Sequence, residues 1–71
     1  MNNALIRAEM FLGTNHVKTK RDKDMLLISK DVIEFGTKKE LLELLQVECN
    51  CNKFFWNAAG DSTEWFSLGT F

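Results

Sequence analysis

Residues 36–48 read GTKKELLELLQVE, and they hold the clearest signal of regular structure in this 71-residue chain. Thr37 and Glu40 have the spacing of a capping box, in which each side chain bonds the backbone N–H of the other residue. The four leucines between residues 41 and 45 fall within an arc of about 160° on a helix. The stretch therefore predicts a helix over residues 37–48 with one leucine-rich face.

Two short β-rich segments precede this helix. Residues 17–20 alternate β-branched and charged side chains, and residues 25–28 are apolar. Residues 21–24 between them are all charged, so the two segments predict a hairpin. A second apolar run at residues 32–35 follows the turn-like Ser29-Lys30-Asp31, and it predicts a further strand or the continuation of a bulged one.

Residues 4–12 fit either a strand or a helix. Their side chains alternate between two sets, as in a strand. Most of them also favour helices, with Asn3 as an N-cap and Gly13 as the residue that ends the helix. We favour the strand and keep the helix as the alternative.

Six of the eight aromatic residues lie between Phe54 and Phe71. Aromatic runs at residues 54–56 and 65–66 flank a Gly-Asp-Ser stretch, a pattern that predicts a hairpin. With the hairpin centred on Asp61, Trp56 is expected opposite Phe66. Phe55 and Trp65 then share the other face, because side chains alternate along a strand.

These segments predict an α+β fold in a single domain over residues 1–71. We expect a small antiparallel sheet of four to five strands, including the aromatic hairpin, packed on one central helix near 37–48. A chain this short has a marginal core, which supplies about 3–5 kcal/mol on its own.

One helix covers only one face of a sheet. The aromatic rings on the second face are then either covered by the N-terminal segment, above all if it is a helix, or left partly exposed. Aromatic side chains are common anchors of protein interfaces. The sequence therefore predicts a partner-binding patch of Phe55, Trp65 and Phe71, with Asp61 and Glu64 at its rim to steer a basic partner. The expected function is that of a non-enzymatic adaptor, inhibitor or modulator that binds another protein, and a homodimer through the same hairpin is an alternative.

The charge distribution supports a second hypothesis. Residues 1–30 carry six basic and three acidic side chains, and residues 31–71 carry three basic and seven acidic ones. The basic segment contains Lys18, Lys20, Arg21 and Lys23, and lysine and arginine contacts to phosphates often dominate the affinity for nucleic acids. The alternative function is therefore nucleic-acid binding, although the acidic half of the chain opposes a polyanion.

The residues do not form a recognisable catalytic, cofactor or metal motif. Cys49 and Cys51 have one residue between them, a spacing that strains a disulfide and lacks the further ligands of a zinc site. His16 is the single histidine and lies in a polar stretch. We therefore expect no enzyme activity, no cofactor and no metal, with both thiols in packing roles.

Three features of the sequence predict where in the cell the protein is located. The sequence has no apolar run long enough to span a bilayer. Residues 1–3 do not resemble the start of a signal peptide. Together with the unpaired cysteines, this predicts a cytoplasmic protein without membrane contact, and its size and make-up are typical of small proteins of phages or mobile elements.

Overall fold

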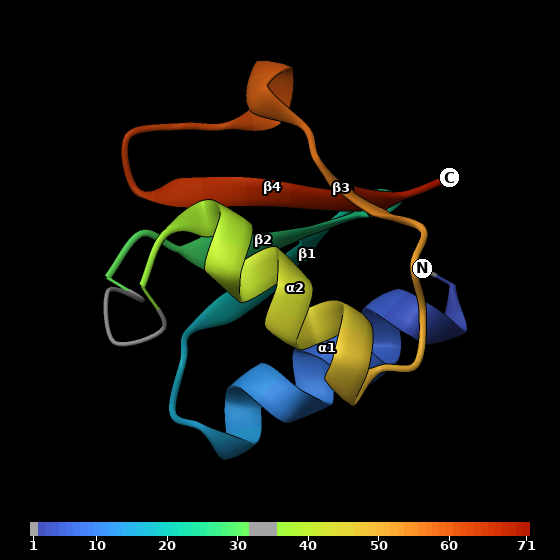
Figure 1. The fold of residues 1–71 in the computed structure, drawn as a ribbon. Coiled ribbons are helices and arrows are strands. Elements are labelled where there is room, and N and C mark those ends of the chain that lie inside the picture. Colours follow the sequence, from blue (N-terminus) through green and yellow to red (C-terminus); the bar gives the residue numbers. More distant parts are fainter. Residues whose placement is uncertain (1, 32–35) are drawn as a thin grey trace.

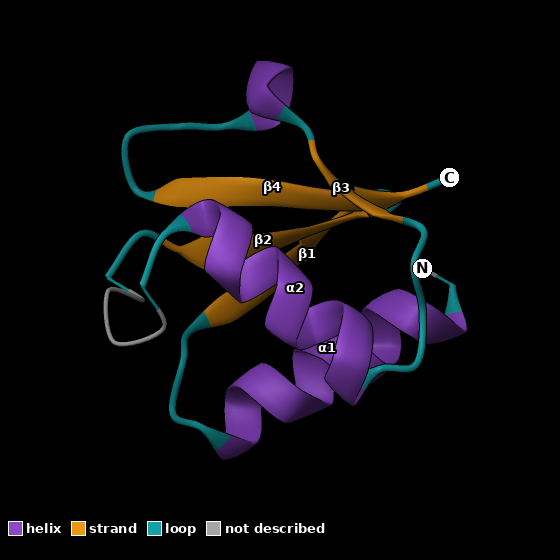
Figure 2. Ribbon diagram, viewed as in Figure 1, coloured by secondary structure: helices purple, strands orange, loops and turns teal. Residues whose placement is uncertain are grey.

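The computed structural model describes residues 2–31 and 36–71. These residues form two helices and a four-stranded antiparallel sheet, which confirms the α+β class (Figures 1 and 2). In chain order the elements are α1 (Asn3–Thr14), β1 (Thr19–Asp22), β2 (Met25–Ser29), α2 (Lys38–Glu48), β3 (Phe54–Trp56), a short 3-10 turn η2 (Ala58–Gly60) and β4 (Trp65–Thr70). The order of strands across the sheet is β1-β2-β4-β3.

The predicted central helix is confirmed as α2. Thr37 is its N-cap, and both hydrogen bonds of the capping box with Glu40 are present. Leu41 and Leu45 are buried, while Leu42 and Leu44 are half-buried at the sides. The helix ends at Glu48, and Asn50 follows with a φ of 48°, in the left-handed region that stops a helix.

The strand prediction for residues 4–12 is wrong, because these residues form α1. Asn2, not Asn3, is the N-cap, and its Oδ1 accepts from the Leu5 N–H at 2.9 Å. Leu5, Ala8 and Leu12 are buried at helical spacing, so burial in this segment follows one stripe of a helix instead of every second residue. Gly13 is inside the helix, and His16 adopts the left-handed φ of 63° just after it.

The sheet is built from two hairpins. The hairpin between β1 and β2 is confirmed, with Asp22 opposite Met25 across a two-residue turn. The aromatic hairpin between β3 and β4 is also confirmed, but Trp56 lies opposite Leu68 instead of Phe66. This shift of two residues leaves each side chain on its expected face. The strand predicted at residues 32–35 lies outside the described residues.

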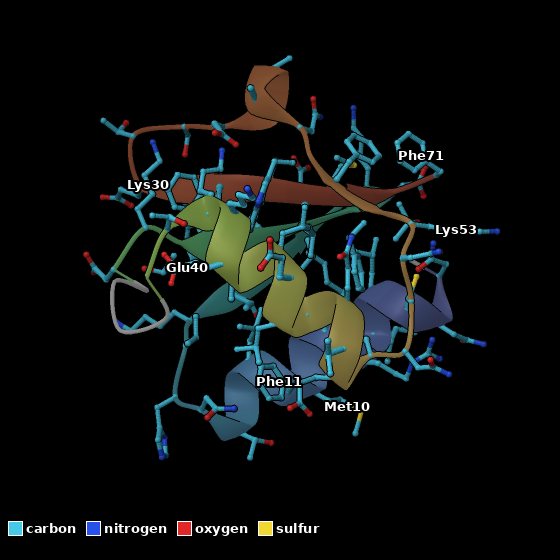
Figure 3. The ribbon with its side chains drawn as sticks, viewed as in Figure 1. Met10, Phe11, Lys30, Glu40, Lys53 and Phe71 are labelled. Atoms are coloured by element: carbon cyan, nitrogen blue, oxygen red, sulfur yellow. The ribbon has the colours of Figure 1, made fainter. Side chains whose placement is uncertain are left out.

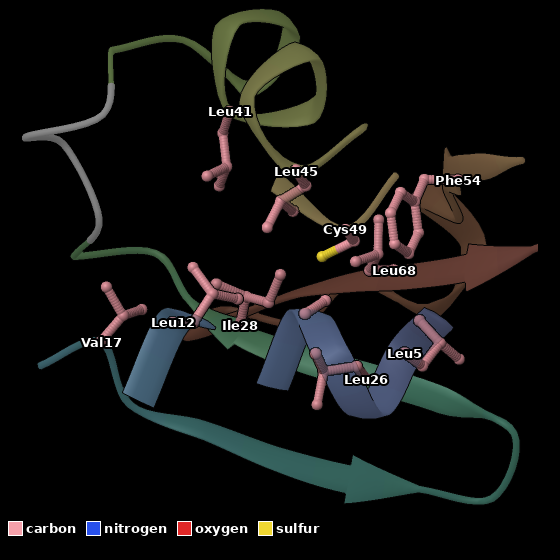
Figure 4. Close-up of a cluster of buried hydrophobic side chains, with 11 residues drawn as sticks. Leu5, Leu12, Val17, Leu26, Ile28, Leu41, Leu45, Cys49, Phe54 and Leu68 are labelled. Carbon is pink, nitrogen blue, oxygen red and sulfur yellow. The ribbon is translucent and has the colours of Figure 1, made fainter. Parts of the chain in front are cut away.

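Both helices cover the same face of the sheet, where a single helix had been expected (Figure 1). The core lies between these two layers (Figure 4). The sheet contributes Leu26, Ile28, Phe54 and Leu68, and the helices contribute Leu5, Ala8, Leu12, Leu41, Leu45 and Cys49. Neither α1 nor α2 lies on the opposite face of the sheet, which is called here the open face.

Candidate docking surface on the open face

The strand registers define which side chains share the open face. Lys20, Leu27 and Ser67 form one row across β1, β2 and β4. On one side of this row lie Ser29 and Trp65 with Lys18, whose carbonyl accepts from the Ser29 N–H at 3.0 Å. On the other side lies a row of four residues: Asp22, Met25, Gly69 and Phe55.

The middle of the open face is covered by the connection between β3 and β4. The turn η2 stands on the side of the sheet away from the helices (Figure 1). It packs closely on Ser67, because a Cβ added to Gly60 would lie 2.9 Å from Ser67 Oγ. Ser67 is consequently buried. The exposed parts of the open face are therefore its two ends.

The first end is apolar and contains Phe55 and Phe71. Their ring centroids are 5.0 Å apart. Phe71 is 86% exposed, and Phe55 is half-buried. Phe55 and Met25 close over Gly69, where an added Cβ would meet Met25 Cε at 2.7 Å and Phe55 Cζ at 2.9 Å. Glycine thus lets two side chains cross the strand here, and the ring of Phe55 packs against that of Phe71.

The second end surrounds Trp65. Lys20 Nζ lies 5.3 Å from the centroid of the Trp65 ring. A pocket of about 440 Å³ beside this ring is lined by Lys18, Ser29, Lys30, Asp31, Thr63, Glu64 and Trp65. Figure 3 shows Lys30 and Phe71 at opposite ends of the sheet. The structure therefore brings Phe55 and Phe71 together, and places Trp65 on the same face but apart from them.

The two acidic residues predicted at the rim of the patch, Asp61 and Glu64, have different surroundings in the structure. Glu64 is exposed and lines the Trp65 pocket. Asp61 is held inside the fold, where Oδ1 accepts from the Ser67 N–H at 2.8 Å and Oδ2 lies 3.2 Å from Lys38 Nζ. Asp61 thus links β4 to the start of α2, and its charge is paired.

Replacing Asp61 tests this link. Asp61→Ala leaves the Ser67 N–H without its acceptor, and we expect the free energy of unfolding to fall by about 1–3 kcal/mol. Asp61→Asn keeps an oxygen acceptor and loses only the partly exposed ion pair, which contributes about 0–1 kcal/mol. Urea denaturation of both variants measures the difference, and an equal loss would contradict the role of the backbone bond.

Trp56 and Phe66 belong to the helix side. Their rings pack in a T-shaped pair at 5.8 Å, and Trp56 Nε1–H donates to the Lys38 carbonyl at 3.0 Å. Lys38 Nζ and Lys30 Nζ lie 4.6 Å and 5.2 Å from the Phe66 ring centroid. These two aromatic residues are therefore part of the contact between sheet and helix.

The four cations of the basic segment do not form one patch. Lys18 and Lys20 are on the open face, whereas Arg21 is on the helix face and forms two hydrogen bonds to Glu9, at 2.7 and 2.9 Å. Lys23 lies in the turn after β1 with a φ of 55°. Lys30, which was not predicted, lines the same pocket as Lys18 and Trp65, and its Nζ lies over the Phe66 ring.

The Arg21–Glu9 pair gives the stability a small pH dependence. The hydrogen bond from Arg21 lowers the pKa of Glu9 below its ordinary value of 4.5. A carboxylate whose pKa is lowered by folding stabilises the native state above its unfolded pKa, and this contribution is lost as the pH falls through the folded pKa. Glu9→Gln should therefore flatten the fall of stability below pH 4.5. Urea midpoints across this range measure it, and an unchanged slope would contradict it.

The cysteines and the histidine form no cluster. Cys49 is buried, and desolvation raises the pKa of its thiol, although the charge of Arg7 acts in the opposite direction. Cys51 is half-exposed, and neither thiol is in a disulfide. Within residues 2–31 and 36–71, no three histidine, cysteine or carboxylate side chains are grouped as metal ligands. In the same part of the chain, no helix is long and apolar enough to cross a membrane.

Comparison of the chain with protein-family models, curated proteins and solved structures finds no match. The residues of the open face are therefore the basis for the proposed function.

Sequence reasoning missed three contributors to this surface: Lys30, Met25 and Gly69. Met25 is the first residue of β2, Lys30 follows its last residue, and Gly69 lies near the end of β4. Only the pairing of the strands brings them beside Trp65 and Phe55. Once a strand register is assumed, a glycine opposite an aromatic residue is the one local feature of the sequence that could have predicted this part of the surface.

Proposed function

We propose that this chain is a small, non-enzymatic module that binds another protein through the open face of its sheet. One observation carries the proposal: both helices cover one face, and the rings of Phe55, Phe71 and Trp65 stay partly exposed on the other. Exposed apolar patches on monomers often have a binding role, and aromatic anchors dominate the energy of many interfaces.

The anchor rings are held on strands, which favours this use. Phe55 is on β3, and Phe71 follows β4 directly, with its N–H donating to the Lys53 carbonyl at 2.9 Å. A ring held by strand backbone loses little conformational freedom on binding. Such a module acts by occluding a surface of its partner, as an adaptor, inhibitor or modulator does, and needs no catalytic group.

Photo-crosslinking from position 71 tests the proposal. A photoreactive phenylalanine analogue replaces Phe71 in one variant and Val47 in the control, since Val47 is also exposed (77%) but lies on α2. In nuclease-treated lysate of the native cells, we expect an adduct of one discrete mass from position 71 only. Phe55→Ser should remove this adduct by withdrawing the supporting ring.

Three results would contradict protein binding through this face. They are equal adducts from both positions, no adduct from either, and an adduct that nuclease removes. The same crosslinking with purified protein alone tests for a homodimer. An adduct of twice the chain mass would show that the partner is a second copy of the chain.

Nucleic-acid binding is the second candidate, and one observation favours it. Lys20 lies over the Trp65 ring and Lys18 lines the pocket beside it, and single strands commonly stack bases on aromatic rings beside basic side chains. If the chain binds nucleic acid, its affinity for a labelled oligothymidylate should fall steeply between about 50 and 200 mM salt.

A further inference from the structure

We propose that a second pocket, at the end of α2, binds a phosphate group carried on a small hydroxylated molecule, the chemistry of a sugar phosphate. The pocket is formed by the helices and the connection to β3, so the proposal does not depend on protein binding through the open face. Three observations support it: the side chains of the lining, the orientation of Arg7 and the absence of an acidic partner for the cations of the pocket among the described residues.

The pocket is formed where α2 ends and the chain turns toward β3, beside α1. Asn50 reverses the chain with a φ of 48°, and the Cys51 N–H donates to the Gln46 carbonyl at 3.0 Å. At the far end of this connection, the Lys53 carbonyl accepts from the Phe71 N–H. Backbone hydrogen bonds thus hold both ends of the segment that forms the wall. The space has a volume of about 510 Å³ and is lined by Arg7, Gln46, Asn50, Cys51, Asn52 and Lys53.

Arg7 lines the pocket from α1 in a fixed orientation. Its Nε–H donates to the Cys49 carbonyl at 3.2 Å. A guanidinium has five N–H groups, and in the described part of the chain this bond is the one that Arg7 makes, so its terminal nitrogens have donors left. These planar N–H groups match two oxygens of one phosphate, and an arginine already held in place loses little freedom when it binds them.

The charge of the lining favours a phosphomonoester. Arg7 and Lys53 carry two positive charges, and both lie outside the two ion pairs formed in the described part of the chain. None of the described lining residues is acidic. A phosphomonoester carries about −1.5 to −2 charges near pH 7 and has three acceptor oxygens. It therefore matches the two cations better than a carboxylate, which carries a single charge.

The end of α2 offers an anion little opposition, although a helix C-terminus carries a partial negative charge. The carbonyls of residues 45, 46 and 47 accept backbone N–H groups from residues 49–51. The next carbonyl on the pocket side, that of Cys49, accepts from Arg7. These oxygens thus already have donors, and Arg7 places a full positive charge beside them.

The carboxamides of the pocket indicate the rest of the ligand. Gln46, Asn50 and Asn52 each offer two N–H donors and one oxygen acceptor, which suit hydroxyl groups because a hydroxyl both donates and accepts. The described lining contains no aliphatic or aromatic side chain. The volume lies within the range of small-molecule sites, about 300–1,000 Å³, and exceeds the needs of a phosphate alone. A body that carries several hydroxyl groups therefore fits this lining.

Nuclear magnetic resonance of the ¹⁵N-labelled chain provides the test. The probe is ribose 5-phosphate at low ionic strength, since salt screens exposed charges. Ribose and inorganic phosphate are the matched controls, because each lacks one half of the ligand. We expect saturable shifts of the amide signals of residue 7 and residues 46–53, with an affinity at least about fivefold higher than for either control.

Substitutions identify the cations. Arg7→Gln and Lys53→Gln should each weaken ribose 5-phosphate by at least about fivefold, and Lys39→Gln, which changes an exposed lysine of α2 outside the lining, should not. Lys53→Gln keeps the test decisive if Arg7→Gln loosens the end of α2, because the Lys53 side chain forms no hydrogen bond or ion pair in the described structure.

Four results would overturn the proposal. They are an absence of saturable shifts, shifts confined to residues outside the pocket, equal affinity for the sugar phosphate and either control, and unchanged affinity in both Arg7→Gln and Lys53→Gln. The Phe71 crosslink is independent of all four, so protein binding through the open face stands or fails separately.

Discussion

Trp56→Ala is expected to unfold most of the domain at room temperature, whereas Trp65→Ala leaves it folded. Trp56 packs on the core, pairs with Phe66 and donates a hydrogen bond to the start of α2. Truncation of a core tryptophan costs about 3–5 kcal/mol. A domain of this length is stabilised by about the same amount, so little stability remains.

Trp65 differs because its ring lies on the open face, half-buried under Lys20. Its removal takes away mainly a surface contact, and we expect a loss of about 1 kcal/mol or less. Circular dichroism and urea denaturation of the two variants measure the contrast. If Trp65→Ala also unfolds the chain, the indole is part of the core, and the docking surface loses this ring.

Leu45→Ala has the second large expected effect. Leu45 is fully buried on α2, in the layer between the helices and the sheet (Figure 4). Truncating a buried leucine removes apolar contacts and leaves a cavity, which together cost about 2–5 kcal/mol. The variant should therefore be at the edge of unfolding, with a urea midpoint close to zero.

Val47→Ala is the matched control for this change. Val47 is on the same helix, two residues away, and is 77% exposed. A surface substitution of this kind changes stability by less than about 0.5 kcal/mol. Equal losses at positions 45 and 47 would show that helix propensity, and not burial, stabilises α2.

The two tryptophans show how this small molecule divides its aromatic side chains. Trp56 and Phe66 complete the contact between sheet and helix, and Phe55, Phe71 and Trp65 are left on the open face. The sheet and two helices bury their largest aliphatic side chains against each other, so the rings on the open face contribute less to stability. They are therefore the residues that selection for binding could change at the lowest cost to folding.

Local signals predicted α2 and both hairpins. The capping box and the leucine-rich arc lie within residues 36–48, and each hairpin joins strands that are close in the chain. The face of each aromatic residue was also predictable, because an error of two residues in register does not change the alternation of side chains. Phe55 and Trp65 could thus be assigned to one face before their neighbours were known.

Residues 4–12 show where local signals were insufficient. Their pattern of apolar residues is compatible with the period of a strand and with that of a helix. The helix forms because Leu5, Ala8 and Leu12 are buried against the sheet and against α2. The Asn2 side chain also bonds the Thr70 hydroxyl on β4, a contact across almost the whole chain. Such contacts exist only after the sheet has formed, so no short window of sequence contains them.

The candidate site depended even more on long-range pairing. Sequence alone placed few basic residues near Trp65, yet Lys20 lies over its ring and Lys18 lines the pocket beside it, because β2 pairs with both β1 and β4. The separation of Trp65 from Phe55 follows from the strand registers, in which Phe55 lies opposite Gly69 and Trp65 lies opposite Ser29. In the same way, Asp61 changes from a predicted rim residue to a link between β4 and α2.

The amino-acid sequence by itself determined the capped central helix, the two hairpins and the alternation that assigns each ring to a face. These features arise from backbone hydrogen bonds and side-chain spacing among neighbours in the chain. Only the assembled fold makes residues 3–14 a helix, places both helices on one face and brings Lys18 and Lys20 to Trp65. The reason is that these outcomes depend on burial and strand order, which are properties of the whole fold and not of any one segment.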